Sequence, residues 1–303
     1  SQTATFTGAQ LTAETLILTE TVAGTSGLVI NVGSGESADF TNITASTFDS
    51  GSDTLRISGS TGGETITGPN IAATISGNAG NDNITGGSAA DIINGGNGND
   101  TIDGNDGADT LTGGSGDDIY IFNSNDVDAG ETIVEASSGG TDTISVASST
   151  NFSAMSNTSF DEIEVVQFAG SGLTATFNSG QLGDETIELQ ELVTGTSNLI
   201  VIVDTISETV SFANISASSF TSGSDTFVVQ GSSGSDTITA PNIASTLYGN
   251  DGTDTLIGGS QADIINGGDG ADTLTGNGGA DTFQWNGNNQ NSGLTTSTAD
   301  TVT

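Results

Sequence analysis

Residues 95 to 112 read GGNGNDTIDGNDGADTLT, and an aspartate recurs in them at a nine-residue period, at Asp100 and Asp109, each time behind glycines. The residue two places after each aspartate is apolar, first Ile102 and then Leu111. Glycine permits the positive φ angles of a tight turn, and a triplet with one central apolar residue is typical of a short strand. Repetition at a fixed period therefore predicts a stack of turn-and-strand units.

The nine-residue period continues on both sides of this stretch and then returns further along the chain. Five units run from 77 to 121, and a second array lies between 231 and 284. The heptapeptide ADIINGG occurs at 90–96 and again at 262–268, and SGSDT recurs at the same offset, at 50–54 and 222–226. We therefore predict a long repeat with the nonapeptide nested inside each copy. The aspartates at the sixth position of the units are Asp82, Asp91, Asp100, Asp109 and Asp118, then Asp236, Asp254, Asp263, Asp272 and Asp281.

The nonapeptides resemble the RTX calcium-binding repeat, G-G-x-G-x-D-x-U-x, in which U is a large apolar residue. The resemblance implies that two units make one coil of a right-handed parallel β-solenoid, so that alternate units stack on the same edge. It also implies that each calcium ion sits between stacked turns and takes an aspartate from each, together with turn carbonyls. About six hard oxygens of this kind suit calcium better than magnesium or zinc.

The resemblance assigns the acidic residues to four stacked edges. Glu64 occupies the acidic position of an earlier unit and is expected as a further ligand of the first edge, although its side chain is longer than that of aspartate. The units that contain Ala73 and Ser245 have no carboxylate at this position. The edges are Asp82, Asp100 and Asp118; Asp91 and Asp109; Asp236, Asp254 and Asp272; and Asp263 and Asp281.

Stacked carboxylates give a physical reason for a metal. Adjacent coils of a β-solenoid lie ~4.8 Å apart, which is the spacing of neighbouring strands. Two carboxylates at that distance repel by roughly 1 kcal/mol in water and by several times more inside a protein. A divalent ion between them converts repulsion into coordination, so we expect calcium binding and folding to be coupled. The alternative is an ordinary β-helix whose Gly-Asp turns bind nothing.

The segments outside the arrays are also rich in predicted strands. They alternate apolar and polar residues in short runs such as NLIVIVD (198–204), and no stretch predicts a helix. We expect an all-β fold in which these segments form a wider, calcium-free parallel β-solenoid, with a β-sandwich as the alternative. The expected order is a β-rich segment at 1–58, the first array at 59–122, a β-rich segment at 123–230, the second array at 231–285 and the start of the next repeat segment at 286–303.

The composition restricts the class of function. The formal net charge is −37, from 38 acidic residues against one basic residue, Arg56. Such a chain is not expected to bind nucleic acid, which needs Lys and Arg to replace its counterions, or an anionic membrane surface. Histidine and cysteine are absent, so the usual catalytic bases and nucleophiles are missing and we expect no enzyme. No apolar run approaches the ~18 residues of a membrane-spanning helix.

We expect a secreted structural protein that self-assembles, as a calcium-stabilised subunit of a bacterial surface layer or extracellular filament. The resemblance to the RTX family implies type I secretion and an extracellular or cell-surface location. Copies of the same chain are the expected partners, with cell-surface glycans bound through other regions. The final STADTVT (297–303) resembles GGTDTISV (139–146), so we expect this chain to be part of a longer protein.

Two alternatives remain open for the function. One is an extender or binding region of a giant RTX adhesin, and the other is the secretion or folding region of a secreted enzyme. A binding region would be marked by clustered aromatics or by a flat ladder of Thr-x-Thr strands. The sequence gives no regular Thr-x-Thr ladder at the coil spacing, which favours the structural interpretation.

Overall fold

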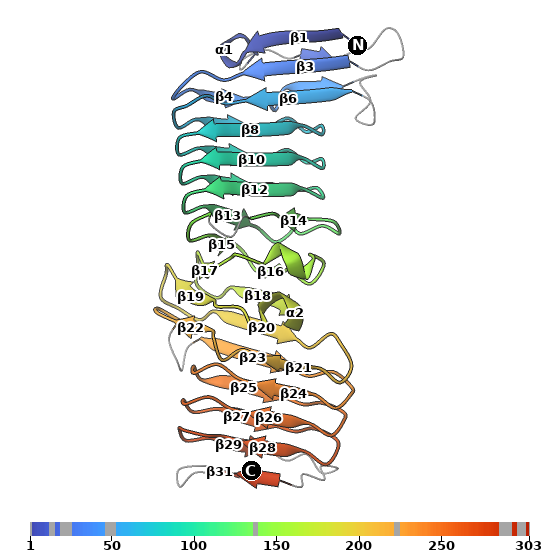
Figure 1. Cartoon of the computed structure of the whole chain (residues 1–303), viewed down its shortest axis with the longest axis vertical. Coiled ribbons are helices and arrows are strands. Elements are labelled where there is room, and N and C mark those ends of the chain that lie inside the picture. The colour runs from blue at the N-terminus through green and yellow to red at the C-terminus, as the bar shows by residue number, and fades with distance from the viewer. Residues whose placement is uncertain are drawn as a thin grey trace. The chain divides into compact units, whose positions relative to one another are not determined.

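The computed structural model describes residues 2–11, 16–18, 26–45, 53–135, 139–220, 225–284, 293–295 and 301–302 of the 303-residue chain (Figure 1). Two compact units divide the chain. The first comprises 1–145 and 154–163, and the second comprises 146–153 and 164–303. Each unit contains one nonapeptide array and is a parallel β-solenoid, in which strands of successive coils lie side by side.

Two parallel sheets form opposite walls of the first unit, and the chain visits them in turn. A small additional sheet pairs β2 (Leu16–Leu18) with β5 (Ile43–Ala45). One wall contains β1 (Gln2–Thr7), β3 (Ser26–Asn31), β6 (Thr54–Ser58), β8 (Thr74–Ala79), β10 (Ile92–Asn97), β12 (Thr110–Ser115) and β14 (Thr132–Ile133). The other contains β4 (Ser37–Asp39), β7 (Thr65–Thr67), β9 (Asn83–Thr85), β11 (Thr101–Asp103), β13 (Ile119–Phe122) and β15 (Thr143–Val146).

The second unit is built in the same way, from strands of three parallel sheets. The longest contains β16 (Thr150–Asn151), β18 (Thr174–Asn178), β20 (Asn198–Ile202), β23 (Thr226–Gln230), β25 (Ser245–Tyr248), β27 (Ile264–Asn266), β29 (Thr282–Gln284) and β31 (Thr301–Val302). The others contain β17 (Val165–Phe168), β19 (Glu188–Glu191) and β22 (Ser216–Ala217), and β21 (Thr209–Ser211), β24 (Thr237–Thr239), β26 (Thr255–Ile257), β28 (Thr273–Thr275) and β30 (Gly293–Thr295).

The register of the arrays equals two nonapeptides. Ile75 pairs with Ile93, and Ile93 pairs with Leu111, so one full coil of the solenoid is two units long. Ile238 and Leu256 are paired at the same interval in the second unit. The prediction that alternate units stack on the same edge is therefore confirmed.

The segment between the arrays is a solenoid as well, with longer coils. Ala175 pairs with Leu199, and Leu199 pairs with Phe227, so both of these coils are longer than two nonapeptides. These pairings are parallel, as are β17 with β19 and β19 with β22. The structure thus excludes the β-sandwich alternative here, because a sandwich is built from antiparallel sheets.

Helical structure is limited, among the described residues, to three single turns. They are α1 (Gly8–Leu11), the 3-10 turn at Asn157–Ser159 and α2 (Ser179–Leu182). In α2 the side chain of Gln181 accepts the N–H of Asn178 at 2.7 Å, a capping interaction that makes one turn possible without a periodic apolar pattern. No helix of the described part is long and apolar enough to cross a membrane.

The core changes its side chains with the width of the coil. In the arrays it is a file of single residues with no exposed surface, such as Ile84, Ile102 and Tyr120. In the longer coils phenylalanines fill the added space: the rings of Phe152 and Phe177 stack at 4.7 Å between centroids. Larger side chains are needed there because protein interiors leave few voids.

One row of threonines stacks in register in the second unit, although it does not form a regular Thr-x-Thr ladder. Thr237, Thr255 and Thr273 stack in register on β24, β26 and β28. Thr239 and Thr275 occupy the parallel row, which Ile257 interrupts. The sequence alone hides this row because its members are two nonapeptides apart and alternate with another wall.

Neighbouring isoleucines of β10 give a direct test of the single-file core. Ile93 has no exposed surface, whereas Ile92 beside it is 55% exposed. We expect Ile93→Ala to lower the free energy of unfolding by about 2–5 kcal/mol, because it leaves a cavity that the coils cannot close. Ile92→Ala should change it by about 0.5 kcal/mol or less. Urea unfolding of both variants in saturating calcium measures this, and equal effects would contradict the assignment of β10's faces.

Candidate metal sites

The acidic residues of the arrays lie at the end of a turn, immediately before a strand. Asp82 precedes β9, Asp100 precedes β11 and Asp109 precedes β12. Because each coil takes two nonapeptides, alternate units bring their carboxylates into columns, and these columns are the four edges that the sequence predicts. In the first unit, column A contains Glu64, Asp82, Asp100 and Asp118, and column B contains Asp91 and Asp109. In the second unit, column A contains Asp236, Asp254 and Asp272, and column B contains Asp263 and Asp281.

One oxygen of each carboxylate ties two coils together. The backbone N–H of Asp82 donates to Oδ1 of Asp100 at 2.7 Å, and that of Asp100 donates to Oδ1 of Asp118 at 2.7 Å. Column B repeats the bond between Asp91 and Asp109 at 2.7 Å. The columns of the second unit show it between Asp236 and Asp254, Asp254 and Asp272, and Asp263 and Asp281, at 2.8–3.0 Å.

The second oxygen is the unusual feature of the columns. Oδ2 of six aspartates is buried and accepts no hydrogen bond, although the residues are at most 2% exposed. A buried ionised carboxylate without a partner is strongly unfavourable, so this arrangement calls for a cation at that oxygen. The six aspartates are Asp82, Asp100, Asp109, Asp118, Asp254 and Asp272.

A backbone oxygen lies beside the unpartnered carboxylate oxygen. A Cβ atom placed on Gly77 would lie 2.2 Å from Oδ2 of Asp82 and 2.6 Å from the carbonyl oxygen of Gly95, one coil further on. At Gly249 the corresponding distances are 2.4 Å to Oδ2 of Asp254 and 2.3 Å to the carbonyl oxygen of Gly267. The first glycine of the unit is therefore required for space. Carboxylate and carbonyl oxygens converging on one point are the donors that calcium takes.

Side chains alone do not complete these sites. In the described part of the chain, no three carboxylates already surround a single point as the ligands of a bound metal do. Each turn contributes one carboxylate, so the remaining donors have to be backbone carbonyls of the turns. This division of donors agrees with the ligand set that the resemblance implies.

Asp91 and Asp263 differ from the other aspartates of their arrays. The N–H of Gly87 donates to Oδ2 of Asp91 at 2.8 Å, and the N–H of Gly259 donates to Oδ2 of Asp263 at 2.8 Å. These turns read GGSAAD and GGSQAD, and they lack the glycine that other units have at the fourth position. Both carboxylate oxygens are thus used within the protein, which makes these two aspartates the weakest ligand candidates of their columns.

The carboxylates at the start of column A, in both units, likewise accept hydrogen bonds through both of their oxygens. Oε2 of Glu64 accepts the N–H of Ser60 at 2.8 Å, and Oε1 accepts the N–H of Gly35 at 3.0 Å. Oδ2 of Asp236, at the equivalent place of the second unit, accepts the N–H and the hydroxyl of Ser232 at 2.7 and 2.8 Å. Glu64 therefore lies in its predicted place, where its hydrogen bonds fit a cap on the column, and its role as a ligand stays a prediction.

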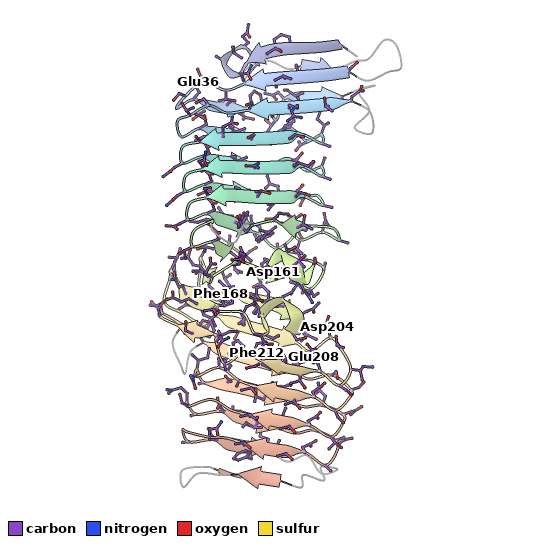
Figure 2. The ribbon with its side chains drawn as sticks, in the orientation of Figure 1. Glu36, Asp161, Phe168, Asp204, Glu208 and Phe212 are labelled. Atoms are coloured by element: carbon purple, nitrogen blue, oxygen red, sulfur yellow. The ribbon has the colours of Figure 1, made fainter. Side chains whose placement is uncertain are left out.

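The sequence pattern misses carboxylates that continue the columns beyond the nonapeptides. Asp118 donates its N–H to Oδ1 of Asp142 at 2.9 Å, and Asp109 donates to Oε2 of Glu131 at 2.7 Å. In the second unit, Glu208, labelled in Figure 2, donates its N–H to Oδ1 of Asp236 at 2.8 Å. The dipeptide Asp-Thr before an apolar residue, which Asp142-Thr143-Ile144 shares with the arrays, is the signal that identifies Asp142.

Burial and stacking change the acidity of the columns. Burial, followed by neighbouring charges, raises the pKa of Asp109, Asp118 and Asp254 to about 7. For Asp118 those neighbours include Asp100 and Asp142 of its own column. Burial likewise raises the pKa of Asp100 to about 6. A cation at Oδ2 would oppose both causes, because it restores a favourable partner for the ionised carboxylate.

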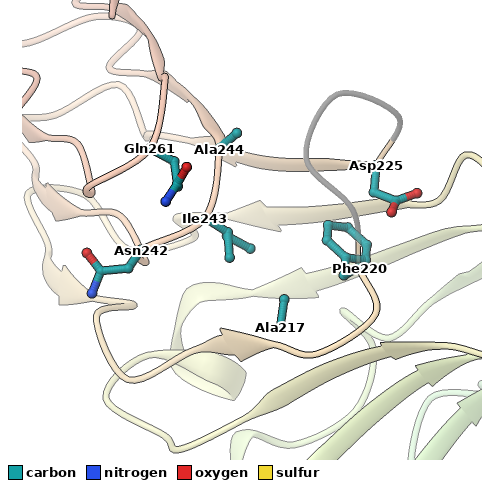
Figure 3. Close-up of a pocket in the computed structure, with 7 residues that line it drawn as sticks. All are labelled: Ala217, Phe220, Asp225, Asn242, Ile243, Ala244 and Gln261. Atoms are coloured by element: carbon teal, nitrogen blue, oxygen red, sulfur yellow. The ribbon is translucent and has the colours of Figure 1, made fainter. Parts of the chain in front are cut away.

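A hollow of about 260 Å³ opens in the second unit, beside the turn that leads to Asp263 (Figure 3). Phe220, Asn242, Ile243 and Gln261 are among the residues that line it, and Asp225 is the one acidic side chain among its described lining residues. Oδ1 of Asp225 accepts the N–H of Ser197 at 2.9 Å. A single carboxylate that ties two coils together does not make an acid–base pair, so this hollow supports no catalytic assignment.

The columns should make the calcium-free chain sensitive to pH. A carboxylate whose pKa is raised by folding stabilises the folded state fully below its unfolded value of ~4, and this contribution is lost as the pH rises through about 7. We expect the free energy of unfolding of metal-free protein to fall between about pH 4.5 and about pH 8, a range that brackets these titrations. Urea unfolding after exhaustive removal of calcium measures it. Stability that rises over the same range would contradict the buried columns.

The two kinds of aspartate should respond differently to substitution. Asp100→Asn removes charge from an oxygen without a partner, so we expect calcium affinity to fall about tenfold or more, or ~1.4 kcal/mol per tenfold. Asp91→Asn should affect calcium affinity less, because both oxygens of Asp91 already accept hydrogen bonds. Calorimetric titration with calcium distinguishes them, after circular dichroism has shown that both variants fold. An equal loss of affinity would mean that the unpartnered oxygen is not the ligand.

The RTX calcium-binding nonapeptide repeat, as a family model, matches three stretches of the chain, 72–102, 94–126 and 248–283. No curated protein and no solved structure matches the chain. The matched stretches contain all six aspartates with an unpartnered oxygen, and repeats of this kind bind calcium. Sequence match, coil register and donor set agree, and these stretches of the chain are RTX calcium-binding nonapeptide repeats.

Proposed function

We propose that this chain is a non-enzymatic structural region of a secreted bacterial protein, which calcium locks into its folded form after export. The observation that carries the proposal is the buried Oδ2 without a partner, repeated on six aspartates. Each such oxygen favours unfolding until a cation binds. Calcium is scarce in the cytosol and abundant outside cells, so the same oxygens would keep the chain unfolded before export and stabilise it afterwards.

Self-assembly in a surface layer or an extracellular filament is the second part of the proposal. The chain has a net charge of −37, and Arg56 is the one basic residue in it. Copies of such a chain repel one another at long range unless cations screen or bridge them. Exposed carboxylates such as Asp106, Asp161 and Glu162, outside the columns, are available for bridging by calcium. Association between copies is therefore expected to need calcium beyond the amount that folds the chain.

A binding region of a giant adhesin is the alternative with a specific observation in its favour. The stacked threonines of β24, β26 and β28 give the second unit a regular row of hydroxyl and methyl groups on one wall. A regular wall of this kind suits a repetitive ligand surface. Strand propensity alone also explains this row, because threonine is favoured in strands at half-exposed positions.

A calcium titration of the purified chain tests both parts of the proposal. We expect far-ultraviolet circular dichroism to change from disordered to β-structure as calcium is added to metal-free protein, because binding and folding are coupled. Light scattering coupled to gel filtration should then show growth in mass at higher calcium. Folding without growth in mass would support the adhesin alternative over an assembling subunit.

A charge-matched control variant distinguishes calcium binding at column A from general screening of negative charge. Asp100→Asn with Asp118→Asn removes two charges from column A, and Asp161→Asn with Glu162→Gln removes two exposed charges outside the arrays. Only the column variant should need more calcium to fold. If magnesium folds the unmodified chain as well as calcium does, general screening rather than a specific site explains folding.

A further inference from the structure

The turn that ends column B of the first unit differs from the nonapeptide turns. The preceding turn of this column is the short stretch 104–109, whereas the turn between β13 and β14, 123–131, is longer and reads NSNDVDAGE. The register widens accordingly, since Leu111 pairs with Ile133, which lies more than two nonapeptides further along the chain. We refer to residues 123–131 as the acidic turn, because it contains Asp126, Asp128 and Glu131.

The acidic turn lies directly on the last nonapeptide turn of column B. The N–H of Gly107 donates to Oδ2 of Asp128 at 3.2 Å, and the N–H of Asp109 donates to Oε2 of Glu131 at 2.7 Å. Glu131 is 1% exposed and takes the place that an aspartate has elsewhere in the column. Asp126 is 6% exposed, so this turn buries two carboxylates of its own.

Asp109 supplies an independent indication of a ligand at this place. It has no exposed surface, and its Oδ2 accepts no hydrogen bond. This oxygen lies inside turn 104–109, where a Cβ atom on Gly104 would come within 2.4 Å of it. The turn stacked above it is the acidic turn, so the unpartnered oxygen belongs to the same space as the three further carboxylates.

The four carboxylates act on one another electrostatically. Burial raises the pKa of Glu131 to about 9, and the charges of Asp109, Asp126 and Asp128 add to this increase. Asp126 and Asp128 likewise contribute, after burial and Asp91, to the raised pKa of Asp109. Arg56 is the sole basic residue of the chain, so no other basic side chain is available to pair with this group.

We propose that Asp109 and the acidic turn form a binding site for one divalent hard cation, calcium, with Asp109, Asp126, Asp128 and Glu131 as carboxylate donors. The site is separate from those between two nonapeptide turns, which have at most two aspartates each. More carboxylates raise the affinity of a calcium site, so this ion binds more tightly than those of the array. The site lies where the coils of two nonapeptides are followed by longer coils.

The site forms by closure of the acidic turn on the ion. No three carboxylates of the described residues already surround one point. Asp126 and Asp128 lie between strands, so their side chains can approach an ion without breaking the hydrogen bonds of β13 and β14. The N–H of Asp109 already donates to Oε2 of Glu131, so these two residues are held in place before the ion binds.

The test is a count of bound calcium on the full chain, by flow dialysis with calcium chloride as the sole divalent salt. The site variant is Asp126→Asn with Asp128→Asn, which removes two charges from the acidic turn and keeps side chains of nearly the same size. The control is Asp161→Asn with Glu162→Gln, which removes the same charge from exposed positions of the same unit, outside turn 104–109 and the acidic turn. We expect the site variant to bind one ion fewer than the unmodified chain and to lack its tightest phase, and the control to match the unmodified chain.

Equal stoichiometry and affinity in the site variant and the control would overturn the proposal. If the site variant does not fold in saturating calcium, Asp128→Asn alone decides, because Asp128 is exposed and its loss leaves the core intact. This single variant should weaken the tightest phase about tenfold or more, and an unchanged tightest phase would overturn the proposal. The count requires only that the chain binds calcium, so failure of self-assembly would leave it unaffected.

Discussion

The structure depends on buried carboxylates of which only one oxygen has a hydrogen-bond partner in the protein. Oδ1 of an array aspartate holds the backbone N–H one coil earlier, and Oδ2 of six aspartates has no partner in the protein. The first contact fixes the stacking of the coils, whereas the second makes that stacking unfavourable until a cation arrives. We therefore expect folding and calcium binding to be one event for the arrays. The raised pKa values of Asp109 and Asp118 have the same cause, because burial and neighbouring carboxylates disfavour the ionised form.

The short coil of two nonapeptides also restricts which residues fit at the turns and in the core of the arrays. It puts the first glycine of each unit against a carboxylate oxygen, which leaves no room for a side chain at Gly77 or Gly95. It also places one apolar residue per strand in the core, so the arrays bury little apolar surface per coil. Where the columns end, the coils lengthen and phenylalanines such as Phe177 and Phe227 take over the core. Ions stabilise the narrow coils, and apolar packing stabilises the wide ones.

Much of this follows from the sequence because the period is unbroken. The nine-residue spacing predicts the parallel solenoid, the pairing of alternate units and the four edges, and the register confirms the stacking. The sequence could not distinguish Asp91 from Asp100, because the difference lies in whether the N–H of Gly87 reaches the carboxylate. It also missed Glu131 and Asp142, which continue the columns after the period is lost. The row of threonines on β24, β26 and β28 was hidden for a related reason, since its members become neighbours only once the length of the coil is known.

A crystal structure of the chain grown with calcium, in which anomalous scattering locates the ions, tests most directly whether the unpartnered oxygens bind calcium. We expect ions in contact with Oδ2 of Asp82, Asp100, Asp109, Asp118, Asp254 and Asp272, each also contacting carbonyl oxygens of the turns. Density that shows those oxygens hydrogen-bonded to the protein or turned to solvent, with no ion beside them, would contradict it.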